Sequence, residues 1–238
     1  MEIGIYTFGN LFADRDGSLP SAGQRLRAIV KLAKLADELG LDVFAVGEHH
    51  RPDMAVSSPA VVLAAVAQAT AKIRLSSATT VLSTLDPVRV FEDFATLDLL
   101  ADGRAELLVG RGSFTENYGL FGYRLEDYDE LFAEKLGLLL ALNKGATVTW
   151  RGKFRPALHH AEISPQPERP LPIWVGVGGT PESAIRAGAL GVPMNLAILA
   201  GPERFVPFAE LHRTAATQAG HVRPKLAVSS HGHLADDG

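Results

Sequence analysis

The stretch VFAVGEHHRPD, residues 43–53, combines a clear fold signal with a cluster of ionisable side chains. Residues 43–46 are apolar and partly β-branched, which predicts a buried strand that ends at the following glycine. Because side chains alternate along an extended chain, Glu48 and His50 are expected on one side and His49 on the other, so that one of the two histidines faces a cavity. These side chains either cap the strand and pair with one another, or line a ligand site at the carboxyl end of a parallel strand. We favour the ligand site.

Apolar strands and amphipathic helices alternate on both sides of this stretch. The predicted strands are residues 3–8, 43–46, 73–82, 105–109, 172–177, 192–199 and 226–230, and the predicted helices are residues 22–39, 59–70, 87–100, 127–142, 181–190 and 202–219. Ser21, Ser58 and Asp86 precede three of the helices as expected N-cap residues, the last two followed by a proline at the first helical position.

This alternation predicts an α/β fold with a parallel sheet and helical crossovers. We expect a TIM-type (β/α)₈ barrel rather than an open doubly wound sheet, because no Gly-rich dinucleotide fingerprint follows the first strand. No Pro/Gly/Ser-rich linker is visible, so residues 1–238 are expected to form a single barrel domain. An insertion at about residues 115–171 interrupts the rhythm, and residues 147–150 and 161–163 within it are expected to form extra strands or a lid.

Only seven strands are predicted, so the last strand-helix portion of the barrel is expected to be missing. Two explanations stay open for this feature. Either the chain is shortened, or the barrel is incomplete and its edge between the first and seventh strands is covered by the tail, the lid or a partner.

Composition excludes several function classes. The net charge of −4 is spread over interspersed acids and bases, which argues against a nucleic-acid surface or a polybasic membrane anchor and favours a small-molecule substrate. The chain has no cysteine, so disulfides, thiolate nucleophiles and thiolate metal sites are excluded. The first residues are typical of a strand rather than a signal peptide, and the longest apolar run, residues 59–67, is too short to span a bilayer. We therefore expect a cytoplasmic protein.

The carboxyl ends of the predicted strands carry the candidate binding groups. Gly178, Gly179 and Thr180 precede a helix, where glycines let an anion approach the free amides of the helix N-terminus, although a tight turn uses similar residues. Arg111 stands between two glycines and either binds a phosphate through both of its terminal nitrogens or makes an ion pair. Together these residues indicate a phosphorylated cofactor.

Six blocks in order along residues 1–234 resemble the bacterial luciferase-like family of flavin-dependent monooxygenases. The blocks are GEHH at 47–50, SATTVL at 77–82, DPVR at 86–89, GRAE at 103–106, GRGSF at 110–114 and WVGVGGTP at 174–181. The resemblance implies a luciferase-like barrel, reduced FMN supplied by a separate flavin reductase, and transfer of one oxygen atom from O₂ to an organic substrate. The missing last strand departs from the family pattern.

The resemblance also implies roles for individual residues. His49 matches the family's active-site histidine near the flavin ring, with Glu48 or His50 orienting it or serving a dimer interface. Ala78 and Thr79 match the segment at the isoalloxazine ring, where a non-proline cis peptide bond is typical. The family's phosphate-binding arginine corresponds to Arg111, and its phosphate loop corresponds to Gly178, Gly179 and Thr180.

The resemblance further implies a homodimer through the helices after the second and third strands. Ala60, Ala64 and Ala67 give the first of these helices a small-residue face, which internal packing explains equally well.

Three other functions stay open from the sequence. The first is hydride transfer with the deazaflavin F420, as in a relative within the same family. The second is a non-catalytic flavin-binding protein. His49, His50, His231 and His233 are also compatible with a metal site in a barrel hydrolase. The substrate is not identified by any motif; aromatic residues of the insertion either shape its pocket or pack the insertion itself.

Overall fold

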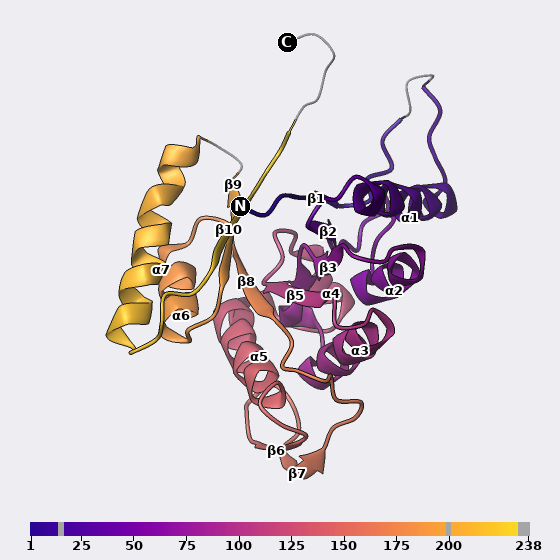
Figure 1. The fold of residues 1–238 in the computed structure, drawn as a ribbon. Helices are drawn as coiled ribbons and strands as arrows, with labels where there is room; N and C mark the ends of the chain where they lie inside the picture. The colour runs from indigo at the N-terminus through magenta and orange to yellow at the C-terminus, as the bar shows by residue number, and fades with distance from the viewer. Residues whose placement is uncertain (14–16, 199–200, 233–238) are drawn as a thin grey trace. The chain divides into compact units, whose positions relative to one another are not determined.

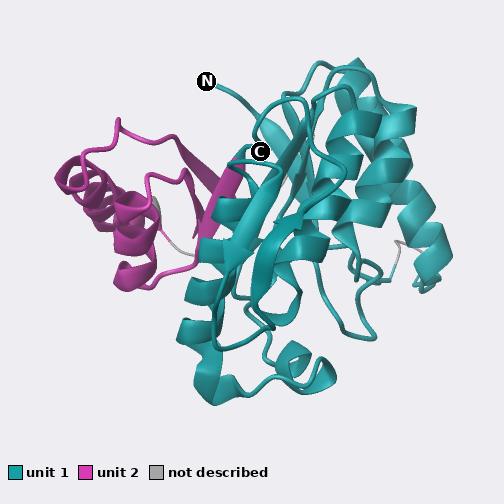
Figure 2. Cartoon of the chain, turned by 90° about the horizontal axis from the view of Figure 1, so that it is seen from below, with its two compact units in different colours: residues 1–172 teal, residues 173–238 magenta. Residues whose placement is uncertain are grey.

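The computed structural model describes residues 1–13, 17–198 and 201–232 (Figure 1). The chain forms two compact units, Met1–Pro172 and Ile173–Gly238 (Figure 2). The organisation of residues 1–238 as one domain stays a prediction. Leu199, at the end of the sixth predicted strand, and His233, one of the four proposed metal ligands, lie outside the described residues.

The first unit contains parallel strands in the order β1-β2-β3-β5, with the short β4 also pairing with β5 in parallel. Its strands and helices are β1 (Gly4–Thr7), α1 (Ala22–Glu38), β2 (Val43–Val46), α2 (Pro59–Ala69), β3 (Arg74–Ser77), β4 (Thr80–Val81), α3 (Pro87–Leu100), β5 (Ala105–Gly110), α4 (Glu116–Leu120), α5 (Tyr128–Leu142), β6 (Thr147–Trp150) and β7 (Leu158–Glu162). Figure 1 shows α1, α2 and α3 in a row on one side of this sheet, each packed against the next.

Local sequence explains how these helices begin. The Ser21 side chain accepts a hydrogen bond from Gln24 N at 3.2 Å, and the Gln24 side chain accepts one from Ser21 N at 2.8 Å, which completes a capping box for α1. Asp86 caps α3 by accepting a hydrogen bond from Val88 N at 2.8 Å. Ser58 occupies the predicted N-cap position of α2, with Pro59 as the first helical residue, but its side chain makes no capping bond.

The predicted strand over residues 73–82 is wrong as a continuous element. It is divided into β3 and β4 by a cis peptide bond between Ala78 and Thr79, and residues 82–84 form a 3₁₀ turn. The amide of Val81, the last residue of β4, donates to the Glu48 carboxylate at 2.9 Å. A side chain 33 residues away therefore holds β4 in place.

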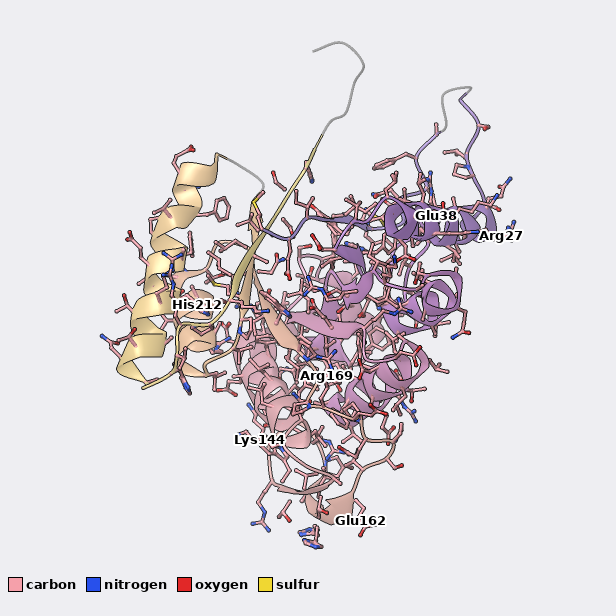
Figure 3. All side chains as sticks on the ribbon, viewed as in Figure 1. Arg27, Glu38, Lys144, Glu162, Arg169 and His212 are labelled. Carbon is pink, nitrogen blue, oxygen red and sulfur yellow. The ribbon has the colours of Figure 1, made fainter. Side chains whose placement is uncertain are left out.

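The insertion contains the extra strands that the sequence predicted. Strands β6 and β7 form an antiparallel hairpin. The insertion also contains the short helix α4, which was not predicted. Glu134 on α5 accepts hydrogen bonds from the amides of Lys153 and Phe154 in the hairpin loop at 2.7 and 3.0 Å, which joins the hairpin to α5. In Figure 3, Arg169, which follows the hairpin, is labelled; its guanidinium donates to the carbonyl of Gly103.

The second unit repeats the alternation of strands and helices. Its elements are β8 (Ile173–Val177), α6 (Pro181–Ala189), β9 (Met194–Ile198), α7 (Val206–Gln218) and β10 (Leu226–Ser230), with the three strands parallel in the order β8-β9-β10. A 3₁₀ turn at residues 202–205 replaces the first turn of the helix predicted from 202. His212 of α7, labelled in Figure 3, is 1% exposed and its ring lies 2.9 Å from the carbonyl of Val192. The α/β alternation expected from the sequence is thus confirmed in both units.

Candidate functional site

The GEHH motif follows β2, and its glutamate is buried. Glu48 is 4% exposed; one carboxylate oxygen accepts a hydrogen bond from His50 Nε2 at 2.8 Å and the other accepts one from Val81 N at 2.9 Å. The amide of Glu48 donates to the carbonyl of Thr79 at 3.1 Å. Glu48 therefore connects the end of β2 to the start of β4, and it shares one side of the motif with His50 as predicted.

His49 faces the other side of the motif, toward aromatic side chains. Its ring makes edge-on contacts with Phe8 and Phe114, with centroid separations of 4.9 and 5.4 Å. Among the described residues, no group bonds its buried Nδ1 atom. Burial and the nearby Arg51 guanidinium lower the pKa of His49 below its ordinary value of 6.5, so the imidazole is neutral at neutral pH. A neutral, half-buried imidazole with one unused nitrogen can exchange a hydrogen bond or a proton with a bound molecule.

Three strand ends meet at the cis peptide bond between Ala78 and Thr79. Ala78 N donates to the carbonyl of Val46 at 2.7 Å. A Cβ atom added at Gly47 would lie 2.5 Å from the Phe8 ring and 2.8 Å from the carbonyl oxygen of Ala78, so only glycine fits there. Thr79 packs against Gly110 at the end of β5. The non-proline cis peptide bond implied by the family resemblance is present.

Arg111 follows β5 and is held by residues of the insertion. Its guanidinium carbon lies 4.7 Å from the centre of the Tyr128 ring, and its Nη1 atom is 2.6 Å from the Asp129 carboxylate. The hydroxyls of Tyr118 and Tyr128 donate to the carbonyls of Arg111 and Gly112, each at 3.2 Å. Backbone and side chain of Arg111 are therefore fixed together, which suits a residue that recognises an anion.

The predicted phosphate loop lies in the second unit, between β8 and α6. Gly179 has a φ of +134°, a conformation that favours glycine, and a Cβ atom at Gly178 or Gly179 would meet no atom within 4 Å. Thr180 occupies the N-cap position of α6 and makes no side-chain capping bond. The two glycines therefore leave space at the N-terminus of a nine-residue helix that begins with Pro181, the position predicted for the anion.

Residues 114–121 form a segment that sequence reasoning did not connect to the histidine motif. Arg51 donates to Glu116 at 2.8 Å and its guanidinium lies 4.6 Å from the centre of the Phe114 ring. The ring of Phe121 makes an edge-on contact with His50 at 4.9 Å. The aromatic residues themselves were visible in the sequence, but the 65-residue separation between Arg51 and Glu116 gave no local sign that they meet.

The aromatic residues of the insertion divide into two groups. Trp150 packs on Gly137 and Phe154 binds Glu134 through its amide, so both serve the packing of the hairpin on α5. The others contact basic or imidazole side chains: Phe121 contacts His50, Tyr123 lies under Lys135, and Tyr128 lies under Arg111.

Lys135 on α5 is a buried cation that the sequence did not single out. It is 3% exposed, and its ammonium group donates to the carbonyl of Ser83 at 2.7 Å and lies 3.9 Å from the centre of the Tyr123 ring. Burial lowers the pKa of Lys135 from 10.5 to about 8. The ammonium thus sits in an apolar environment with a carbonyl and an aromatic face as neighbours.

This depressed pKa predicts a stability that rises with pH. Above pH 8 the unfolded chain binds more protons at Lys135 than the folded chain does, so the free energy of unfolding increases until the unfolded-state pKa of 10.5 is reached. Between pH 7.5 and pH 9.5 the gain should be about 2 kcal/mol. Urea unfolding across this range measures it, and Lys135→Met should remove the rise; an equal slope in the variant would assign the effect to other groups.

The described residues contain neither a metal-ligand cluster nor a membrane-spanning helix. Within residues 1–13, 17–198 and 201–232, no group of three or more His, Asp or Glu side chains is placed to hold a metal ion. His231 follows β10 in the second unit, whereas His49 and His50 lie in the first. No described helix combines the length and apolar character needed to cross a bilayer.

Residues 1–237 match a family described as luciferase-like monooxygenase. The chain belongs to this family. N-acetyl-S-alkylcysteine monooxygenase of Bacillus subtilis is 34% identical over 80% of this chain and 56% of its own length. F420-dependent glucose-6-phosphate dehydrogenase of Amycolatopsis mediterranei is 31% identical over 69% of this chain and 51% of its own length. The chain therefore spans about half the length of these curated luciferase-like relatives.

Solved structures agree with the predicted luciferase-like barrel. The monooxygenase RslO1 of Streptomyces bottropensis superposes with a TM-score of 0.90 and 28% identity, covering 100% of this chain and 73% of its own. The oxygenating constituent of 3,6-diketocamphane monooxygenase from Pseudomonas putida, a type II Baeyer-Villiger monooxygenase in complex with FMN, gives a TM-score of 0.80 with 24% identity over 96% of this chain and 66% of its own. These matches confirm the luciferase-like TIM-barrel class, and the family contains both FMN-binding and F420-dependent proteins.

Proposed function

We propose that this protein is an FMN-dependent monooxygenase that receives reduced FMN from a separate flavin reductase and oxygenates a small organic substrate. The observation that carries the proposal is His49, a neutral imidazole between two aromatic rings with an Nδ1 atom that no described residue bonds. His49 follows β2, next to Glu48, whose amide donates to the carbonyl of Thr79, and the family is described as luciferase-like monooxygenase. The relatives that carry out monooxygenation support the same reading.

The residues of the site fit reduced FMN in their chemistry. When bound, reduced FMN supplies the electrons and the reaction with O₂ that no protein side chain provides. His49 would offer the flavin ring a hydrogen bond or a proton acceptor. Phe8 and Phe114 pack against the imidazole and would keep water from it. Arg111 would hold the phosphate of FMN through its guanidinium. In the second unit, Gly178, Gly179 and Thr180 precede a helix N-terminus, an arrangement that by itself also suits an anion. The Ala78–Thr79 peptide would lie against the isoalloxazine ring.

Glu48 and His50 would support this chemistry indirectly. Glu48 bonds His50 and Val81 rather than His49, so it would fix the backbone that carries His49. His50 contacts Phe121 of the insertion, and this contact supports a role for His50 in positioning a substrate. Both residues stay candidates for the catalytic set.

One relative supports F420 as an alternative to FMN. A relative that is 31% identical to this chain is named an F420-dependent dehydrogenase, so hydride transfer with F420 is the alternative function. A non-catalytic flavin-binding protein would bind FMN but show no substrate-dependent oxygen consumption. The homodimer through α2 and α3, the reductase partner and the cytoplasmic location stay predictions.

The phosphate role of Arg111 predicts a selective loss of affinity. Arg111→Ala should weaken the binding of reduced FMN about tenfold or more, because a charge-assisted pair of hydrogen bonds is lost. Riboflavin, which has no phosphate, should bind the variant and the parent protein equally well. Anaerobic fluorescence titrations with both flavins measure this difference.

Arg124→Ala is the matched control for this experiment. Arg124 lies in the insertion, whose residues hold Arg111, but it pairs with Glu126 at an exposed position, so its loss should leave both affinities unchanged. If Arg111→Ala weakened FMN and riboflavin by the same factor, Arg111 would support the fold of the site instead of recognising phosphate.

A further inference from the structure

The Asp129 carboxylate occupies one side of the Arg111 guanidinium. Asp129 Oδ1 lies 2.6 Å from Arg111 Nη1, yet the Asp129 side chain is 69% exposed whereas that of Arg111 is 17% exposed. Arg111 is also held by the face of the Tyr128 ring, and its backbone carbonyl accepts a hydrogen bond from the Tyr118 hydroxyl. The arginine is therefore fixed by groups other than Asp129, while the carboxylate can move into solvent.

A carboxylate and a phosphate monoester offer a guanidinium the same kind of partner. Both present anionic oxygens that accept the N–H donors of arginine, and the two anions repel each other when they share one cation. A phosphate drawn to Arg111 therefore meets a negative charge that is already in contact with it. An ion pair whose carboxylate is largely exposed adds little to the stability of a fold, so the structure does not depend on this contact.

We propose that Asp129 and a phosphate monoester compete for Arg111, so that Asp129 sets the affinity of the phosphate site. This inference rests on the proposed role of Arg111 in binding the FMN phosphate. Asp129 acts through Arg111 and is a positioning residue, with no contact to the reacting atoms. Its effect is confined to ligands that carry a phosphate group.

The test compares two flavins that differ only in phosphate. The full chain and its Asp129→Asn variant are titrated anaerobically with reduced FMN and with reduced riboflavin, and the ratio of the two dissociation constants is measured. Asp129→Asn should tighten FMN binding about three- to fivefold, the range that an exposed charge pair supports, and leave riboflavin unchanged. Asp129→Glu keeps the charge and should restore the ratio of the parent protein. The gain in Asp129→Asn should shrink as salt is added.

Glu130→Gln is the matched control in the same helical turn. Glu130 is as exposed as Asp129, at 68%, but it pairs with Lys153 at 2.7 Å. The variant should therefore keep the parent ratio, which separates a local contact with Arg111 from a general change in charge. Asp129→Ser serves as a second variant, and unfolding curves confirm that each protein is folded.

Different results identify which idea fails. If Arg111→Ala leaves the FMN-to-riboflavin ratio unchanged, the proposed phosphate role fails and the competition fails with it. If Arg111→Ala lowers FMN affinity but Asp129→Asn and Asp129→Ser leave it unchanged or weaker, the competition alone is wrong. Equal tightening in Asp129→Asn and Glu130→Gln would also contradict the inference.

Discussion

His49→Ala is expected to lower the rate of substrate oxygenation about 100-fold, which is the lower end of what a positioned acid or base contributes. Its affinity for reduced FMN should change less than about threefold, because the phosphate contacts supply most of that binding. The reason is the position of His49, whose neutral ring lies between Phe8 and Phe114 and whose Nδ1 atom has no partner among the described residues. Single-turnover measurements with preformed reduced flavin separate the two effects.

The pH dependence gives an independent check on the same residue. Because burial and Arg51 lower the pKa of His49 below 6.5, the neutral imidazole persists into mildly acidic solution and the rate should fall only below that pH. His49→Asn, which keeps a hydrogen-bonding group but cannot take up a proton, should lose this acidic limb. Unchanged turnover in His49→Ala would remove the residue from the mechanism.

Glu48→Ala has the largest expected effect on stability. The substitution leaves Val81 N and the half-buried His50 without their partner, and it empties a site that is 4% exposed. Loss of one member of a buried polar pair predicts a decrease of about 4 kcal/mol in the free energy of unfolding. Urea unfolding at pH 7 measures the change.

Glu48→Gln is the control, since its amide oxygen can still accept from Val81 N. It should retain most of the stability, with a loss of about 1–2 kcal/mol for the weaker neutral bonds. If Glu48→Ala were as stable as the parent protein but much slower in turnover, Glu48 would belong to the chemistry instead of the framework.

Local sequence was sufficient for most elements of the fold. The capping box at Ser21, the Asp86 cap and the apolar spacing of the helices each depend on residues within a few positions of one another. The opposite orientation of His49 and of the Glu48–His50 pair followed from the alternation of an extended chain.

The features that were missed depend on contacts between distant residues. The Val81 amide in β4 is held by Glu48, 33 residues earlier, and the segment at residues 114–121 is held by the contact of Arg51 with Glu116. The burial of Lys135 depends on Ser83, 52 residues earlier. The hydrophobic periodicity of the sequence does not predict such contacts, because each one forms only when separate strand-helix units pack together.

The cofactor distinguishes the two candidate functions most directly. In a Trp150→Phe background, Trp174 of β8 is the one tryptophan left of the two in the sequence and precedes the Gly178 loop, so its fluorescence reports on that loop. We would titrate this protein anaerobically with reduced FMN and, in parallel, with reduced F420. Saturable binding of FMN in preference to F420 is the predicted result. Preference for F420 would contradict the monooxygenase assignment in favour of hydride transfer, and binding of neither cofactor by the folded protein would contradict both.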